Sequence, residues 1–179
     1  MKRRLMIGAT PLIALLTTAA GWAQHASMPA GMTHEEHLSQ MQKASALKRR
    51  GAVAMGFDQD ATTHHFGLTP NGGFIQVQAN DSADASNVAA IRSHLRTIAE
   101  AFAAGDFSSP VMTHEDTPPG VPDMQRLTAA ITFRFMETER GGRVQISTTS
   151  ATALAAIHDF LRYQIKEHGT GDSLAIQRR

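Results

Sequence analysis

The 179-residue sequence contains no cysteine, one tryptophan and one tyrosine. The absence of cysteine excludes disulfides, thiolate catalysis and zinc–thiolate sites. The 17 Lys and Arg residues nearly balance the 16 Asp and Glu residues, and no basic cluster stands out, so we expect no nucleic-acid partner. The sequence also lacks a Gly-x-Ser-x-Gly elbow, a P-loop and a dinucleotide-binding glycine fingerprint. We therefore expect a binding protein without catalytic residues.

Long hydrophobic runs are also missing, apart from one short run near the N-terminus. Residues 2–4 are cationic, residues 5–20 are mostly apolar, and small residues precede Gln24, which is the pattern of a secretory signal. The run is shorter than the roughly 20 apolar residues of a membrane-spanning helix. Residues 1–23 thus predict export to the periplasm or medium, with no membrane span after cleavage. Cleavage would leave 14 of the 17 Lys and Arg against 16 Asp and Glu, a net charge near −2.

Residues 24–54 form an arm that is rich in methionine and histidine. Thr33 followed by Glu36 is a capping box, which predicts a short helix that ends near the cations at 48–50. Short Met/His tracts in exported chains are typical of metal-binding segments, and a plain tether is the alternative. The candidate ligands of the arm are His25, Met28, Met32, His34 and His37.

Residues 55–179 contain a predicted internal repeat. When residues 64–106 are aligned with 133–172, both glycine pairs coincide, and the strand FIQVQ matches RVQIS. Each copy has alternating strands around a hairpin and then a helix with one apolar stripe. The pattern predicts an α+β fold, a two-layer sandwich of duplicated ββα units. These units would give a four-stranded, mostly antiparallel sheet with two helices on one face.

The segment between the copies, residues 107–127, contains four prolines. These prolines predict an ordered loop rather than a helix or strand, and loops of this length in compact domains are usually functional or disordered. After the second copy we expect a frayed C-terminal segment.

A comparison of the two copies predicts a metal site in the folded domain. His64 and His94 of the first copy align with phenylalanines of the second copy, at positions that face the sheet–helix layer. The joining segment adds Met112 and His114. Imidazole and thioether ligands suit copper, so we predict a copper site of His64, His94, Met112 and His114, with zinc as the alternative ion. The alternative interpretation of each histidine is a hydrogen-bonded core residue.

These patterns together predict a periplasmic protein that binds or buffers a transition metal. The first alternative is a non-catalytic module that binds a periplasmic partner protein or a small molecule, or forms a homodimer. Such a module would use the 107–127 loop or the polar sheet face of Gln76, Gln78, Arg143, Gln145 and Ser147. The third interpretation is a hydrolytic enzyme that uses the acid–base cluster His114-Glu115-Asp116.

Three stretches, MGFDQDATTHHF, MTHEDTPPGVP and AAIHDFLRYQIKEHGTGD, resemble a family of short, exported, uncharacterised bacterial proteins. Some members carry an aspartate carbamoyltransferase label. The resemblance covers roughly residues 55–172 and implies no activity, because the chain lacks the length and the Ser-Thr-Arg-Thr phosphate motif of a transcarbamylase. The Met/His arm is separately similar to metal-binding tracts of periplasmic copper-resistance proteins.

Overall fold

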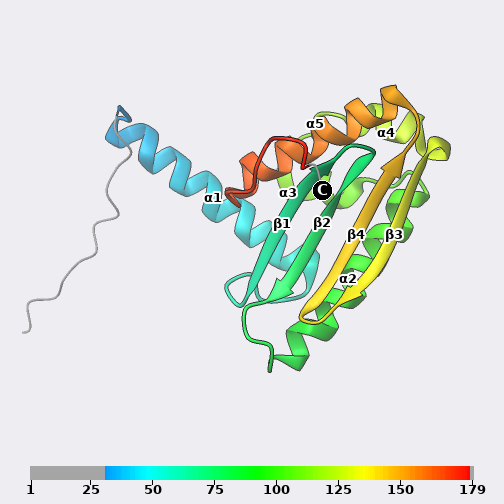
Figure 1. Cartoon of the computed structure of the whole chain (residues 1–179). Coiled ribbons are helices and arrows are strands. Elements are labelled where there is room, and N and C mark those ends of the chain that lie inside the picture. The colour runs from blue at the N-terminus through cyan, green and yellow to red at the C-terminus, as the bar shows by residue number, and fades with distance from the viewer. Residues whose placement is uncertain (1–30, 178–179) are drawn as a thin grey trace, which may run out of the picture.

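The computed structural model of the protein describes residues 31–177, without the side chains of residues 44 and 47–54. The predicted signal and the arm residues His25 and Met28 lie outside the described residues. One open sheet faces the viewer in Figure 1, and the main helices cover its far side.

Two antiparallel hairpins form the sheet. The first joins β1 (Thr62–Thr69) to β2 (Gly72–Ala79), and the second joins β3 (Ile131–Thr138) to β4 (Gly141–Thr148). The strand order is β1-β2-β4-β3, so the second strands of the two hairpins lie antiparallel at the centre. Alternate residues such as Ile75 and Val77 are buried, as the period of two predicts.

Two long helices, α2 (Ala85–Ala103) and α5 (Ala151–His168), form the second layer on one face of the sheet. Side chains cap both at their N-termini: Asp84 accepts from the Asn87 N–H, and Ser150 accepts from the Ala153 N–H. The sequence-based fold class, α+β with a four-stranded antiparallel sheet and two helices on one face, is confirmed.

Each long helix covers mainly the strands of the other half of the chain. Helix α2 follows β2 but packs chiefly against β3 and β4, whereas α5 follows β4 and packs chiefly against β1 and β2. Removal of either half would expose the apolar face of the other, so the two halves form one cooperative unit.

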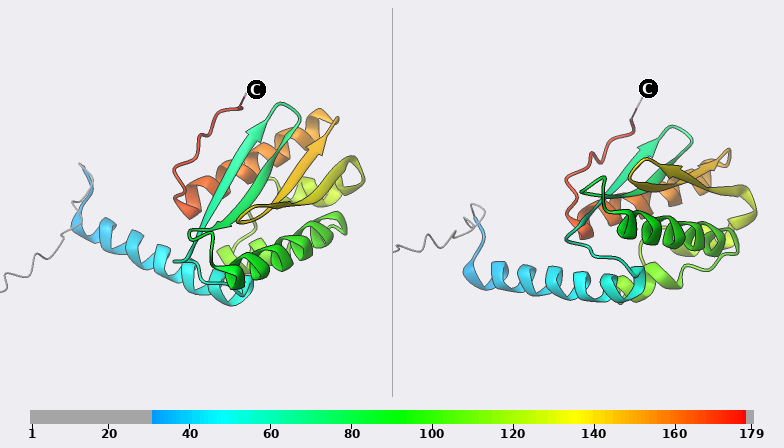
Figure 2. Two further views of the ribbon diagram at one scale, coloured as in Figure 1. Left: turned by 60° about the horizontal axis from the view of Figure 1, so that its bottom comes forward. Right: turned by 90° about the horizontal axis from the view of Figure 1, so that it is seen from below.

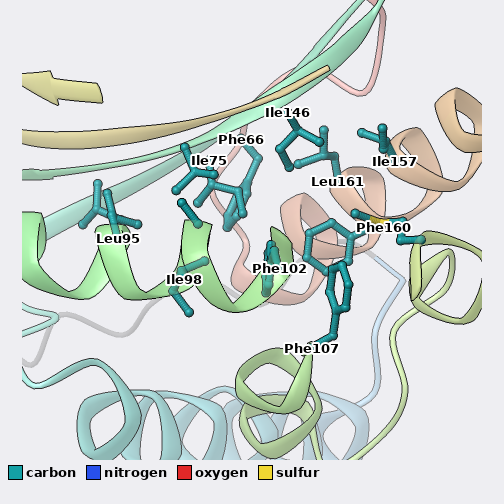
Figure 3. Close-up of a cluster of buried hydrophobic side chains, with 14 of the residues drawn as sticks. Phe66, Ile75, Leu95, Ile98, Phe102, Phe107, Ile146, Ile157, Phe160 and Leu161 are labelled. Carbon is teal, nitrogen blue, oxygen red and sulfur yellow. The ribbon is translucent and has the colours of Figure 1, made fainter. Parts of the chain in front are cut away.

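The core fills the space between the sheet and the helices (Figure 3). Its aromatic centre combines α2 and α5 with the segment between the halves, because Phe102 and Phe107 stack with ring centres 4.4 Å apart. The ring of Phe160 meets Phe102 edge-on at 6.1 Å. All three rings are fully buried, and they fix the position of the segment that starts at Phe107.

The segment 107–127 is not the loop that its prolines predicted. It contains helices α3 (Ser108–His114) and α4 (Val121–Arg126), and a 3-10 turn, η1 (Thr128–Ala130), follows. Pro110 and Pro122 both lie in the first turn of a helix. A missing N–H costs no hydrogen bond in a first turn, so these prolines are compatible with the helices.

Helix α1 (His34–Met55) is longer than predicted. Its capping box is present, because the Thr33 N–H donates to Glu36 and the Glu36 N–H donates to the Thr33 hydroxyl. The helix does not stop at the cations of residues 48–50. It continues to Met55 and ends before Gly56, whose φ of +71° suits a helix C-terminus.

The C-terminal end of α1 runs beside α3, and its first half projects away from the domain (Figures 1 and 2). The end of the described chain is not frayed as predicted, because the Gln177 N–H donates to the Leu68 carbonyl and Ile176 forms a bridge beside β1.

Candidate metal centre

A cavity of about 70 Å³ lies between the sheet and helices α2, α3 and α5. Most of its wall is apolar, with rings such as Phe66 and Phe102. The wall also contains four histidines, one methionine and one glutamine: His64, His94, His114, His168, Met55 and Gln164. None of the described Asp and Glu residues forms part of this wall. The polar groups of the cavity are therefore mostly imidazole, thioether and amide.

His64 and Met55 form a close pair of potential metal ligands in this wall. The Nε2 atom of His64, on β1, lies 3.3 Å from the Sδ atom of Met55, the last residue of α1. With metal–ligand distances of about 2.0 Å for nitrogen and about 2.3 Å for sulfur, one ion can reach both atoms. A strand and a helix separated by the sharp turn at Gly56 thus bring a histidine and a methionine together.

Two further histidine rings lie next to this pair: His168 on α5 and His114 on α3. His168 stacks on His64 with ring centres 5.9 Å apart and an interplanar angle of 15°. The His114 ring lies edge-on to His168 at 5.2 Å. The Nε2–H of His114 donates to the Oε1 of Gln164 at 3.1 Å.

His94 lies on the α2 side of the same cavity. The ring of Phe57 contacts both His94 and His64, with its centre 5.6 Å from the centre of His94 and 5.9 Å from the centre of His64. The predicted histidines His64, His94 and His114 therefore all border one cavity. No three His, Asp or Glu side chains in residues 31–177 stand close enough to form a ready-made metal centre.

Burial keeps the two central histidines neutral. Desolvation, with a smaller contribution from neighbouring histidines, lowers the pKa of His64 to about 4 and the pKa of His168 to about 3. Desolvation also lowers the pKa of His94. A metal ion binds only unprotonated imidazole, so these rings need not release a proton to become ligands at neutral pH.

The lowered pKa values of His64 and His168 predict acid sensitivity. Below pH 6.5 the unfolded chain protonates both residues, whereas the folded chain does so only near pH 4 and 3. Their contribution to stability is fully present above pH 6.5 and is lost as the pH falls. Each should lower the free energy of unfolding by about 1.4 kcal/mol per pH unit in that window. Urea unfolding at pH 7, 6 and 5 measures the slope.

The control for this prediction is a variant with His64→Phe and His168→Leu. It should have a shallower dependence of unfolding free energy on pH over the same range, because the two groups that resist protonation are gone. Equal slopes in the wild type and the variant would contradict the assignment of the acid sensitivity to these residues.

Met112 is not part of the cavity, which corrects one predicted ligand. Its side chain is 60 % exposed, whereas His114 borders the cavity. The physical reason is that the segment is helical: residues two apart in a helix point to different sides. In an extended loop, Met112 and His114 could both face one ion. In helix α3 their side chains point in different directions.

The described arm residues lie apart from the cavity. Met32 precedes α1, and His34 and His37 belong to its first turns, at the end of the helix that projects from the domain (Figure 1). They are therefore not part of the wall of this cavity.

Two further histidines have structural roles. His65, next to His64 on β1, contacts Asp172 at 3.1 Å, and the same carboxylate accepts the Phe66 N–H, so this pair attaches the C-terminal segment to the sheet. The Nε2–H of the buried His158 donates to the carbonyls of Thr69 and Gly72, 3.0 and 2.9 Å away. That contact holds α5 against the first hairpin.

The outer face of the sheet, considered above as an interaction surface, has internal contacts of its own. The guanidinium of Arg143 lies 4.0 Å from the ring centre of Phe74 and donates to Gln76. Gln145 donates to the Gly73 carbonyl. These contacts join β2 to β4 across the centre of the sheet.

Sequence reasoning missed three residues of the site: Met55, Gln164 and His168. A signal for two of them was present, because Phe160, Gln164 and His168 follow one another at intervals of four and so continue the apolar stripe of α5. Met55 had no such signal, since only the packing of α1 places its sulfur beside His64.

A larger, polar hollow of about 760 Å³ lies between α1 and α5 and shares His114 and His168 with the cavity. Its wall includes three carboxylates, Glu115, Asp116 and Glu167, and two lysines, Lys43 and Lys166. The two shared histidines therefore stand between an apolar cavity and a polar recess with acidic groups.

Comparison of the chain with protein-family models, with curated proteins and with solved structures gives no match. None of the helices in residues 31–177 is both long and apolar enough to span a membrane. The function of the site therefore has to be inferred from its geometry and chemistry.

Proposed function

We propose that the protein is an exported copper-binding protein that holds the ion at His64, Met55 and His168, with His114 beside them. The observation that carries the proposal is the 3.3 Å approach of His64 Nε2 to Met55 Sδ, next to the stacked ring of His168. Imidazole together with thioether is a donor set that favours copper over magnesium, calcium or manganese.

The charge of the cavity favours Cu(I) over divalent ions. The proposed ligands are neutral, and the described wall contains no Asp or Glu. The electrostatic cost of burying an ion rises with the square of its charge, and the wall has no anion that offsets it. A monovalent, soft ion meets this condition better than Zn²⁺, which remains the alternative ion.

A role in buffering or transfer fits this site better than catalysis. His168 has to rotate before its ring and the His64–Met55 pair can bind one ion, so the site would form as the ion enters. The polar hollow beside His114 and His168 offers a route for the ion, and its three carboxylates outnumber its two lysines, which favours the entry of a cation. The Met/His arm, with His25, Met28, Met32, His34 and His37, would collect copper before transfer to the cavity.

Competition titrations of the purified protein test the proposal. Cu(I), Cu(II) and Zn(II) are each titrated against a chromophoric chelator, and we expect one ion per chain, with Cu(I) bound most tightly. An arm variant, in which the five arm ligands are replaced by serine, should retain the tight Cu(I) site. Loss of tight binding in the arm variant would place the function in the arm, and failure of the wild type to compete for any ion would refute the proposal.

A further inference from the structure

Gln164 is a buried polar residue of the cavity wall, and it is not one of the three proposed copper ligands. It lies on α5, one turn before His168, and only 4 % of its surface is exposed. Its Oε1 accepts a hydrogen bond from His114, but its Nε2 has no hydrogen-bond partner in the described part of the chain. A buried amide donor without a partner is unfavourable, so a further hydrogen-bond acceptor, such as a bound ligand, is expected.

The amide oxygen of Gln164 faces the ring of His114. Because the Nε2–H of His114 donates to Oε1, the amide nitrogen of Gln164 occupies the other arm of the planar group. Gln164 forms part of the same wall as His64, Met55 and His168. The donor is thus held at the cavity by a histidine of the same site.

The cavity has room for more than an ion. Its volume is about 70 Å³, whereas one water molecule requires roughly 10–15 Å³ by a comparable measure. His64, Met55 and His168 supply three ligands, which leaves the fourth position of a four-coordinate ion open. An anion at that position would also reduce the positive charge buried among neutral ligands.

We propose that the cavity binds a small hydrogen-bond acceptor as an external ligand of the metal ion, and that Gln164 Nε2 donates a hydrogen bond to it. The acceptor belongs to the class of hydroxide, water and anions of two or three atoms. This inference rests on the proposed copper site, because the acceptor occupies the open position of that ion.

Azide is the probe that tests the inference. It is a small anion with acceptor nitrogens, and its bond to Cu(II) produces a charge-transfer absorption band. Azide is titrated into Cu(II)-loaded wild type and into Gln164→Leu, with protein in excess over copper. We expect the wild type to bind azide, and the variant to bind it about tenfold more weakly, since the variant lacks a hydrogen bond to a charged acceptor. Copper affinity should change much less.

Thr113→Val is the matched control. Thr113 lines the same cavity, but its hydroxyl donates to the Ser109 carbonyl, so its loss should leave azide affinity unchanged. Gln164→Asn is the second variant, because it keeps the amide and shortens its reach, and it should weaken azide binding as Gln164→Leu does. Equal azide affinity in the wild type and both Gln164 variants, or no azide band in copper-loaded wild type, would overturn the inference while the copper site stands. A wild type that fails to bind copper would overturn both.

Discussion

Replacing His64 with Phe and His168 with Leu is expected to lower the affinity for Cu(I) by more than a hundredfold while the protein stays folded. The loss should exceed the roughly ten- to hundredfold effect of removing outer-shell partners of a metal site, because two ligands are lost. Folding should persist, because phenylalanine is larger than histidine yet matches an apolar wall, and Phe133 packs against the core at the aligned position of β3. Chelator competition measures the affinity, and circular dichroism verifies the fold.

Two single methionine variants, one inside the cavity and one outside it, provide a matched control for the same site. Met55→Leu removes the thioether that lies 3.3 Å from His64 and should weaken Cu(I) binding. Met112→Leu makes the same chemical change at an exposed position outside the cavity and should have no effect. If the two single variants bind Cu(I) equally well, Met55 is not a ligand. If Met112→Leu alone weakens binding, the original sequence-based ligand set is restored.

The largest expected effect on stability comes from adding one methyl group at Gly72 or Gly141. Each begins a central strand, and a Cβ atom would lie 2.1 Å from the Ile146 carbonyl oxygen at Gly72 and 2.3 Å from the Val77 carbonyl oxygen at Gly141. The φ angles, +151° and +159°, also disfavour other residues. Because the obstacle is backbone, relief requires β2 and β4 to separate. Gly72→Ala and Gly141→Ala should each cost about 3 kcal/mol or more, measured by urea unfolding.

Gly169→Ala separates the effect of contact from that of backbone conformation. Gly169 has a φ of +58°, but a Cβ atom there would meet nothing within 4 Å. Its replacement should cost only about 1–2 kcal/mol, the penalty for a left-handed residue. Equal losses at Gly72 and Gly169 would mean that the close approach of the central strands contributes nothing.

The two glycine pairs show which features of the sheet local sequence patterns can predict. Their spacing predicted two hairpins, and both hairpins form. The sequence could not reveal that the same glycines let β2 and β4 pack side by side. That contact joins residues about 70 positions apart, such as Phe74 and Gln145, and no local pattern encodes which strands of two hairpins will be neighbours.

Prediction of the candidate site was partial for a similar reason. His64 and His94 could be found because each replaces a phenylalanine on an apolar face, and this periodicity is local. Met112 lies outside the cavity because a helix replaced the expected loop and turned the side chain to solvent. Met55, His168 and Gln164 lie at or near the ends of α1 and α5, so their proximity to His64 depends on how the helices pack.

The sequence by itself determined the α+β class, the two hairpin-and-helix halves and the faces of the strands and helices that point to the core. These features follow from periods of two and 3.6 residues and from turn and capping chemistry, all of which act over short distances. Only the tertiary structure decided that each long helix covers the strands of the other half and that α1 brings Met55 to His64. Burial against distant elements also lowers the pKa of His64 and His168, because desolvation depends on the whole packed environment.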